Sequence, residues 1–259
     1  MKTLTKHLTA KTKNGNTLVI PYIMAGDHKN GLDGLSETVE LLQDAAASAI
    51  EIGIPFSDPV ADGPIIQEAG IRALKKQTSI FQIVKKLQTI DAKVPLVIMS
   101  YFNPIYNYGI EKFIADLQKT SVKGLIIPDM PFEHNDYIEP VLQDADISLV
   151  RLVSLTTPKE RQKTLVKNAQ GFIYAVAVNG TTGVGKKYAE NIYEHLAYLK
   201  SESEIPVLAG FGVSNIDQVK NFAKVCDGVI IGSFIVNALH SGENQKAADL
   251  VKSAVNIQK

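Results

Sequence analysis

The feature that most limits what this chain can fold into is a regular alternation of short apolar runs with longer amphipathic segments. Each run is short enough for one strand and apolar enough to be covered on both faces, which is typical of strands in parallel sheets. Eight runs occur, at residues 18–25, 49–54, 96–100, 124–127, 148–153, 172–178, 207–209 and 228–231. Eight alternations predict either a closed barrel or a doubly wound sheet.

The segments between the runs have the apolar spacing of helices. In residues 35–47, for example, Val39, Leu42 and Ala46 share one face. The other predicted helices cover residues 80–90, 110–117, 134–143, 159–167, 189–199, 215–223 and 245–255. The chain has 259 residues, and an eightfold barrel typically needs about 250. The GxGxxG dinucleotide pattern is absent after the first strand. We therefore expect an α/β fold, a (β/α)8 TIM barrel forming one domain over residues 1–259.

Two long loops break the regular alternation. Residues 55–64 follow the second predicted strand, and the Gly- and Thr-rich residues 179–187 follow the sixth. In barrels of this kind, the active site is built at the C-terminal ends of the strands. Long loops at that end are candidates for lids, so both are expected to border the site.

Three glycine-bearing turns in the last third of the chain indicate phosphate binding. They lie at residues 180–183, 210–214 and 232–233, and the last precedes a short helix-like segment at 234–239. Backbone N–H groups at a helix N-terminus bind anions, and barrels often place phosphate after strands seven and eight. Any one turn is explained as well by tight chain reversal. Three at the same end favour phosphate, bound by Gly212, Gly232 and Ser233.

A carboxylate interrupts the second apolar run. Strict alternation directs Ile50, Ile52 and Ile54 toward the helices, and Glu51 and Gly53 toward the barrel interior. Removing a carboxylate from water is costly and raises its pKa toward neutrality, as general acid–base catalysis requires. The alternative is a structural Glu held by a neighbouring donor. Glu51 is the first candidate catalytic residue.

A second carboxylate, Asp62, lies on the loop that follows. Beside Gly63 it can simply form a turn, but two carboxylates in different environments can divide acid and base roles. Tyr174 is a further polar group facing the predicted interior, while Tyr22 and Tyr101 lie at the ends of strands one and three. These three tyrosines either wall a substrate pocket or pack in the core.

Composition argues against several classes of protein. Lys plus Arg and Asp plus Glu number 27 each, so the basic face of a nucleic-acid binder is absent. No apolar stretch is long enough for a membrane helix, and residues 1–16 are too polar for a signal peptide. The single cysteine, Cys226, favours a reducing compartment, and the histidines lack metal-ligand spacing. We expect a cytoplasmic protein with no nucleic acid, membrane or metal.

Residues 50–64, IEIGIPFSDPVADGP, resemble the signature of the tryptophan synthase alpha chain family. The likeness covers nearly the whole chain. Residues 21–27, PYIMAGD, are similar to the family's first strand. Residues 210–214, GFGVS, and 232–233, GS, resemble its phosphate turns.

The resemblance implies a (β/α)8 barrel that cleaves indole-3-glycerol phosphate to indole and glyceraldehyde 3-phosphate. It implies Glu51 as the acid and base, and Asp62 as the group that holds the indole N–H. It also implies an α2β2 heterotetramer with a beta chain, in which the pyridoxal phosphate belongs to the beta chain and this chain has no cofactor. The residues it implies for substrate binding are Tyr22, Tyr101, Tyr174, Thr182, Gly183, Phe211, Gly212, Gly232 and Ser233.

Two other functions are compatible with the residues alone. One is another phosphate-binding barrel enzyme, such as a sugar-phosphate isomerase or epimerase, although such enzymes often use a metal or a catalytic Lys or His at a strand end. The other is a non-catalytic subunit that only activates a partner.

Overall fold

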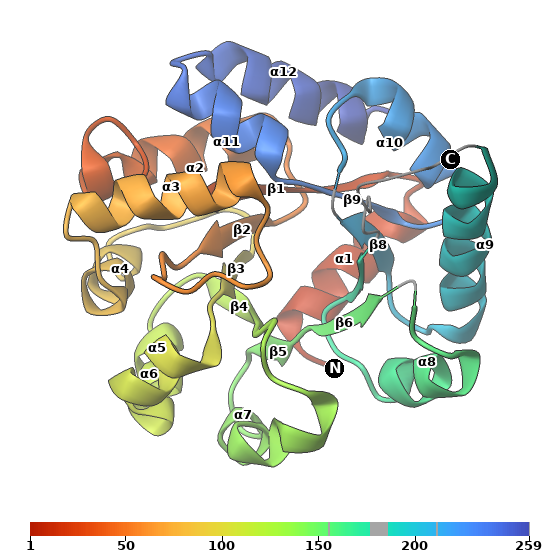
Figure 1. The fold of residues 1–259 in the computed structure, drawn as a ribbon, viewed down its shortest axis with the longest axis horizontal. Helices are drawn as coiled ribbons and strands as arrows, with labels where there is room; N and C mark the ends of the chain where they lie inside the picture. The colour runs from red at the N-terminus through yellow and green to blue at the C-terminus, as the bar shows by residue number, and fades with distance from the viewer. Residues whose placement is uncertain (155, 177–185, 211, 259) are drawn as a thin grey trace.

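The computed structural model describes residues 1–154, 156–176, 186–210 and 212–258, and its strands form a nearly closed parallel barrel surrounded by helices (Figure 1). The sheet order is β5-β4-β3-β2-β1-β9-β8-β7-β6. The strands are β1 Leu18–Met24, β2 Ile50–Gly53, β3 Leu96–Met99, β4 Val122–Ile126, β5 Ser148–Leu149, β6 Arg151–Ser154, β7 Ile173–Val176, β8 Val207–Gly210 and β9 Gly228–Ile231. The predicted barrel architecture is confirmed.

The predicted fifth strand, residues 148–153, is two short strands rather than one. β5 pairs with β4, and Val150 still donates to the carbonyl of Leu125. From Arg151 onward the chain pairs with β7 instead. The two ends of the open sheet are therefore consecutive in sequence, because this part of the chain changes pairing partner at Val150.

The helices cover the outside of the barrel and one of its ends. They are α1 Thr3–Lys13, α2 Leu35–Asp44, α3 Pro64–Lys75, α4 Ile80–Leu87, α5 Phe102–Tyr108, α6 Ile110–Leu117, α7 Glu139–Leu142, α8 Lys159–Val166, α9 Lys186–Glu202, α10 Ile216–Ala223, α11 Ser233–His240 and α12 Asn244–Val255, with 3-10 turns η1 Gly31–Gly34 and η2 Phe132–Tyr137. Within the described ranges, no helix combines the length and the apolar character needed to cross a membrane.

The prediction of one continuous helix over residues 134–143 is wrong. The chain there makes η2 and then the single turn α7, with His134 in a non-helical conformation and Pro140 in the first turn of α7. Proline has no N–H to continue a preceding helix, and its ring clashes with the carbonyl four residues earlier, so it is tolerated only in a first turn. The segment therefore breaks where one continuous helix was expected.

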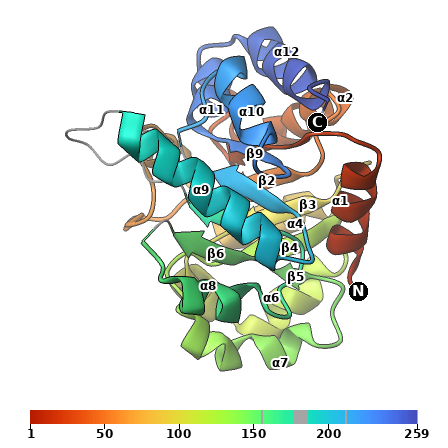
Figure 2. The same ribbon diagram turned by 90° about the vertical axis from the view of Figure 1, so that its right-hand side faces the viewer.

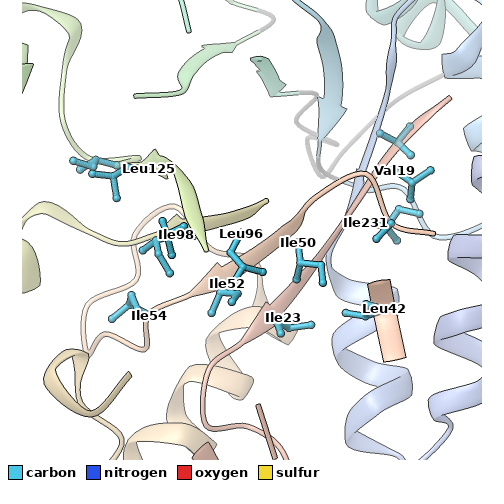
Figure 3. Packing of buried hydrophobic residues seen from close by; sticks show 14 of the residues in the cluster. Val19, Ile23, Leu42, Ile50, Ile52, Ile54, Leu96, Ile98, Leu125 and Ile231 are labelled. Carbon is cyan, nitrogen blue, oxygen red and sulfur yellow. The ribbon is translucent and has the colours of Figure 1, made fainter. Parts of the chain in front are cut away.

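Alternation along the strands divides the buried side chains into an outer and an inner layer. Ile50, Ile52 and Ile54 belong to the outer layer, which packs between the sheet and the helices (Figure 3). The inner layer fills the barrel and includes Tyr22 and Tyr174, so the predicted facing of β2 is confirmed.

Helix α1 covers the N-terminal end of the barrel. Its Leu4 and Leu8 are fully buried and belong to the inner layer, and Figure 2 shows α1 on one side of the strands. The ends at which parallel strands finish lie on the other side, away from this helix. Among the described residues, α1 thus closes the N-terminal end of the barrel, and the C-terminal mouth, where barrel active sites are found, is left for a ligand.

Candidate active site

A cavity opens at the C-terminal mouth of the barrel and brings together most of the predicted site residues. Strands β1, β2, β3, β7 and β9, the loop after β2, and the N-terminal ends of α3 and α11 all contribute to it. Its lining is Tyr22, Glu51, Asp62, Gly63, Ile66, Met99, Tyr174, Gly212, Ile230, Gly232 and Ser233. The carboxylates predicted for acid–base chemistry and the turns predicted for phosphate thus share one cavity.

Glu51 occupies the interior face of β2, between Tyr22 on β1 and Val97 on β3 in the sheet register. Its side chain has no exposed surface, and neither carboxyl oxygen has a hydrogen-bond partner among the described residues. Burial, reinforced by the nearby charge of Asp62, raises the pKa of Glu51 to about 8. At neutral pH this carboxyl is therefore protonated, and the alternative of a structural Glu held by a donor does not describe it.

Asp62 reaches the cavity from the loop that joins β2 to α3. Its backbone N–H donates to the carbonyl of Pro59, and its own carbonyl accepts from the side chain of Gln67 in α3. Burial raises the pKa of Asp62 to about 6, and a hydrogen bond with Tyr101 opposes that rise. The two carboxyls titrate in different ranges, so at neutral pH Glu51 holds a proton while most Asp62 is ionised.

Tyr22 and Tyr174 flank the buried carboxyl, one from β1 and one from β7. Burial raises the pKa of both phenols well above the ordinary value, so both remain neutral. Tyr22 lies within β1 rather than at its end. Its phenol ring has room in the barrel because residue 53 is a glycine. A Cβ on Gly53 would lie 1.9 Å from the Tyr22 hydroxyl oxygen. The glycine that alternation places beside Glu51 therefore makes room for a phenol.

The opposite side of the cavity is suited to an anion. Gly232 precedes the first turn of α11, and no described side chain caps that helix. The N–H groups of the first turn are therefore available, and the helix dipole adds partial positive charge. Gly212, just after β8, faces the same space. These are the positions predicted after strands seven and eight.

Some predicted positions fall outside the described residues, and others were missed. The structure does not describe Thr182, Gly183 or Phe211. It also does not describe residues 179–185 of the loop predicted over 179–187. The missed lining residues are Gly63, Ile66, Met99 and Ile230. Alternation along β3 and β9 could have identified Met99 and Ile230, whereas Ile66 lies on α3, a helix that was not predicted.

Outside this cavity, the sequence features weighed for function have structural roles. Cys226 is buried, and its thiol donates to the carbonyl of Phe222. In the part of the chain that the structure describes, no three His, Cys, Asp or Glu side chains are grouped closely enough to hold a metal ion. The expectation that no metal is needed stays a prediction.

The chain is similar in sequence and structure to tryptophan synthase proteins. A family model described as "Tryptophan synthase alpha chain" matches residues 8–259. The tryptophan synthase alpha chain of Lactococcus lactis is 57% identical over 257 residues, which are 99% of this chain and 100% of that protein. The solved tryptophan synthase subunit alpha of Campylobacter jejuni is 34% identical, with a TM-score of 0.83, over 92% of this chain and 95% of that one. An aminoacrylate-bound tryptophan synthase from M. tuberculosis has a TM-score of 0.87 at 26% identity, covering 98% of both chains.

Proposed function

Because this chain belongs to the tryptophan synthase alpha chain family, we propose that the cavity around Glu51 is where it cleaves its substrate. The chain is a lyase that converts indole-3-glycerol phosphate to indole and glyceraldehyde 3-phosphate, in tryptophan biosynthesis. The observation that carries the proposal is the buried Glu51 carboxyl, which has no partner among the described residues and shares a cavity with the N-terminus of α11. Membership of this family argues against the two alternative functions, a sugar-phosphate isomerase or epimerase and a non-catalytic activating subunit.

Glu51 is the general acid and base of the proposed mechanism. Indole leaves through carbon only after its C3 is protonated, and the side-chain hydroxyl must lose its proton as the C–C bond breaks. Glu51 begins protonated, because burial raises its pKa to about 8. It donates its proton to C3, and the carboxylate formed accepts the hydroxyl proton, so the residue ends as it began.

Asp62 stabilises the charge that this proton transfer creates. Protonation of C3 leaves positive charge on the indole ring nitrogen, and an ionised carboxylate facing that N–H lowers the energy of the cation. The pKa of Asp62, about 6, keeps it ionised at neutral pH. Because Tyr22, Glu51 and Tyr174 around the cavity are buried, this attraction is stronger than at an open surface.

The remaining lining residues hold the two ends of the substrate. Gly212, Gly232 and Ser233 bind the phosphate through backbone amides. The position of Gly232 and Ser233 at the start of α11, and that of Gly212 just after β8 in the same cavity, support this. Tyr22 and Tyr101 border the indole, and Tyr174 orders the glycerol segment. Thr182, Gly183 and Phe211 are assigned to substrate binding by the family resemblance alone.

The wider setting of the chain is also part of the proposal. The chain works with a tryptophan synthase beta chain, and we propose an α2β2 heterotetramer in which the beta chain alone carries pyridoxal phosphate. A cytoplasmic location is supported by the single, buried cysteine. One nearly closed sheet that draws strands from the whole sequence supports a single domain over residues 1–259.

The test is indole release from indole-3-glycerol phosphate by the wild-type chain and by Glu51→Gln. Glutamine keeps the shape of the side chain but cannot transfer the proton, so we expect the cleavage rate to fall roughly two to four orders of magnitude. Substrate binding, measured by calorimetry, should persist because the phosphate contacts remain. Cleavage by Glu51→Gln at the wild-type rate would refute the proposed role.

A further inference from the structure

We propose that Tyr101 is a positioning residue that fixes the loop after β2 and orients the Asp62 carboxylate through its phenol oxygen. This goes beyond lining the indole region, because the hydroxyl rather than the ring carries the role. It rests on the proposed function of Asp62. The geometry around Tyr101 supports it in three respects: where the residue is anchored, what its oxygen contacts, and what that contact does to Asp62.

Tyr101 is anchored between β3 and α5, where the backbone is held on all sides. The Ser100 N–H donates to the carbonyl of Ile126, and the Ser100 hydroxyl donates to the carbonyl of Tyr101 itself. On the other side, the Phe102 N–H donates to the side chain of Asp129. The Tyr101 side chain is 4% exposed. Its phenol therefore extends from a fixed point on the barrel wall.

The loop from residue 55 to residue 62 needs such a fixed point. In the described part of the chain, two hydrogen bonds join the backbone of this loop to the elements on either side: Gln67 of α3 donates to the Asp62 carbonyl, and the Ala61 N–H donates to the Tyr101 hydroxyl oxygen, at 2.9 Å. Only the second comes from the strand side. The Phe56 ring also packs on the Tyr101 ring, with centroids 5.2 Å apart. Tyr101 thus contacts the loop near its start and near its end.

The same hydroxyl also interacts with the Asp62 side chain. Because it accepts from the Ala61 N–H, its own proton is left to face the Asp62 side chain. The interaction with Tyr101 lowers the pKa of Asp62 against the effect of burial. A carboxylate has two oxygens. In the arrangement we propose, one oxygen faces the Tyr101 hydroxyl and the other is left for the indole N–H. The phenol therefore sets both the direction and the charge of the group that faces the substrate.

Tyr101→Phe isolates the hydroxyl because it keeps the ring against Phe56. Loss of a hydrogen bond to a charged group should lower kcat/KM roughly 10- to 100-fold. The acidic limb of the pH profile should move to higher pH, because Asp62 loses the interaction that lowers its pKa. Hydrogen exchange of the Ala61 amide should also become faster. Tyr106→Phe, in α5 and 65% exposed, is the matched control and should change none of these.

The double variant Tyr101→Phe/Asp62→Asn separates this inference from a structural role. If Tyr101 acts through Asp62, the double variant should be no slower than Asp62→Asn alone. Losses that multiply, or a wild-type acidic limb in Tyr101→Phe, would overturn the inference while leaving the proposed function intact. Full activity in both Asp62→Asn and Glu51→Gln would instead overturn the proposed function.

Discussion

At the scale of single residues, the environment of each carboxyl decides its protonation. Glu51 is completely buried, while Asp62 approaches from a loop and interacts with Tyr101, which lowers its pKa against the effect of burial. The pKa of Glu51 rises to about 8 and that of Asp62 to about 6. At neutral pH, one site therefore holds a proton donor, Glu51, and an anion, Asp62. The proposed reaction needs both, because indole is protonated by the first and its positive charge is stabilised by the second.

The pH dependence of cleavage by the isolated chain follows from this difference. We expect kcat/KM to rise as Asp62 ionises near pH 6 and to fall as Glu51 loses its proton near pH 8. Because the two carboxyls interact, each limb of the profile gives an apparent pKa of the pair rather than the pKa of one residue. Asp62→Asn should abolish the acidic limb and keep the alkaline one. Steady-state indole release between pH 5 and pH 9 measures this, and a profile without limbs would be incompatible with these assignments.

Sequence alone could identify Glu51, because a carboxylate inside an alternating apolar strand has few explanations. It left Asp62 undecided, since an Asp beside Gly63 is equally a turn former. It did not predict that Gly53 provides the space for the Tyr22 phenol, or that the Tyr101 hydroxyl contacts the loop. Both depend on where neighbouring strands place side chains in three dimensions, which a single sequence does not specify.

At the scale of elements, strands were easier to predict than helices. A strand buried on both faces gives a continuous apolar run, and the runs match the observed strands apart from the division at Val150. Helices α1, α3 and α5 were not predicted. Helix α3 starts at Pro64, the residue at which the predicted loop over 55–64 ends, and no helix was predicted over the residues that follow. The C-terminal bounds of the strands, which position the site, were predicted within a few residues.

Closure between β9 and β1 depends on one glycine. A Cβ on Gly228 would lie 2.0 Å from the carbonyl oxygen of Leu18, its partner in the sheet register. A backbone atom cannot move aside without opening this pairing, so Gly228→Ala should lower the free energy of unfolding by about 3 kcal/mol. In α3, a Cβ on Gly70 would meet only the Met24 methyl, at 3.6 Å.

Gly70→Ala is therefore the matched control for Gly228→Ala. Alanine favours a helix over glycine by about 1 kcal/mol, so this change should leave stability equal or higher. Urea unfolding of both variants compares them. If Gly228→Ala is as stable as Gly70→Ala, the strands can move apart more easily than this packing allows.

At the scale of the whole molecule, the fold leaves one end of the barrel for chemistry. Helix α1 covers the N-terminal end, and the mouth collects the ends of distant strands and the start of α11. Eight alternations and the chain length predicted this architecture, because few folds accommodate them. Among the described residues, no donor reaches the Glu51 oxygens. Burial without a donor opposes ionisation of this carboxyl and so lowers the stability of the fold at a pH where the carboxyl must ionise.

That burial couples the stability of the whole molecule to pH. The pKa of Glu51 rises from an ordinary 4.5 to about 8 on folding, so the folded chain binds a proton that the unfolded chain releases between these values. Stability from this group is fully present below pH 4.5 and is lost as pH rises through 8. Glu51→Gln has no such proton to lose, so it should gain stability relative to the wild type as pH rises.

The most direct test of a carboxyl enclosed and protonated inside the barrel is the free energy of unfolding of wild type and Glu51→Gln, measured in urea at pH 5 and pH 9. The difference between the two proteins should shift in favour of Glu51→Gln by about 4 kcal/mol over this range. A difference that stays the same at both pH values would mean that Glu51 ionises as freely in the folded chain as in the unfolded one, and would contradict the account.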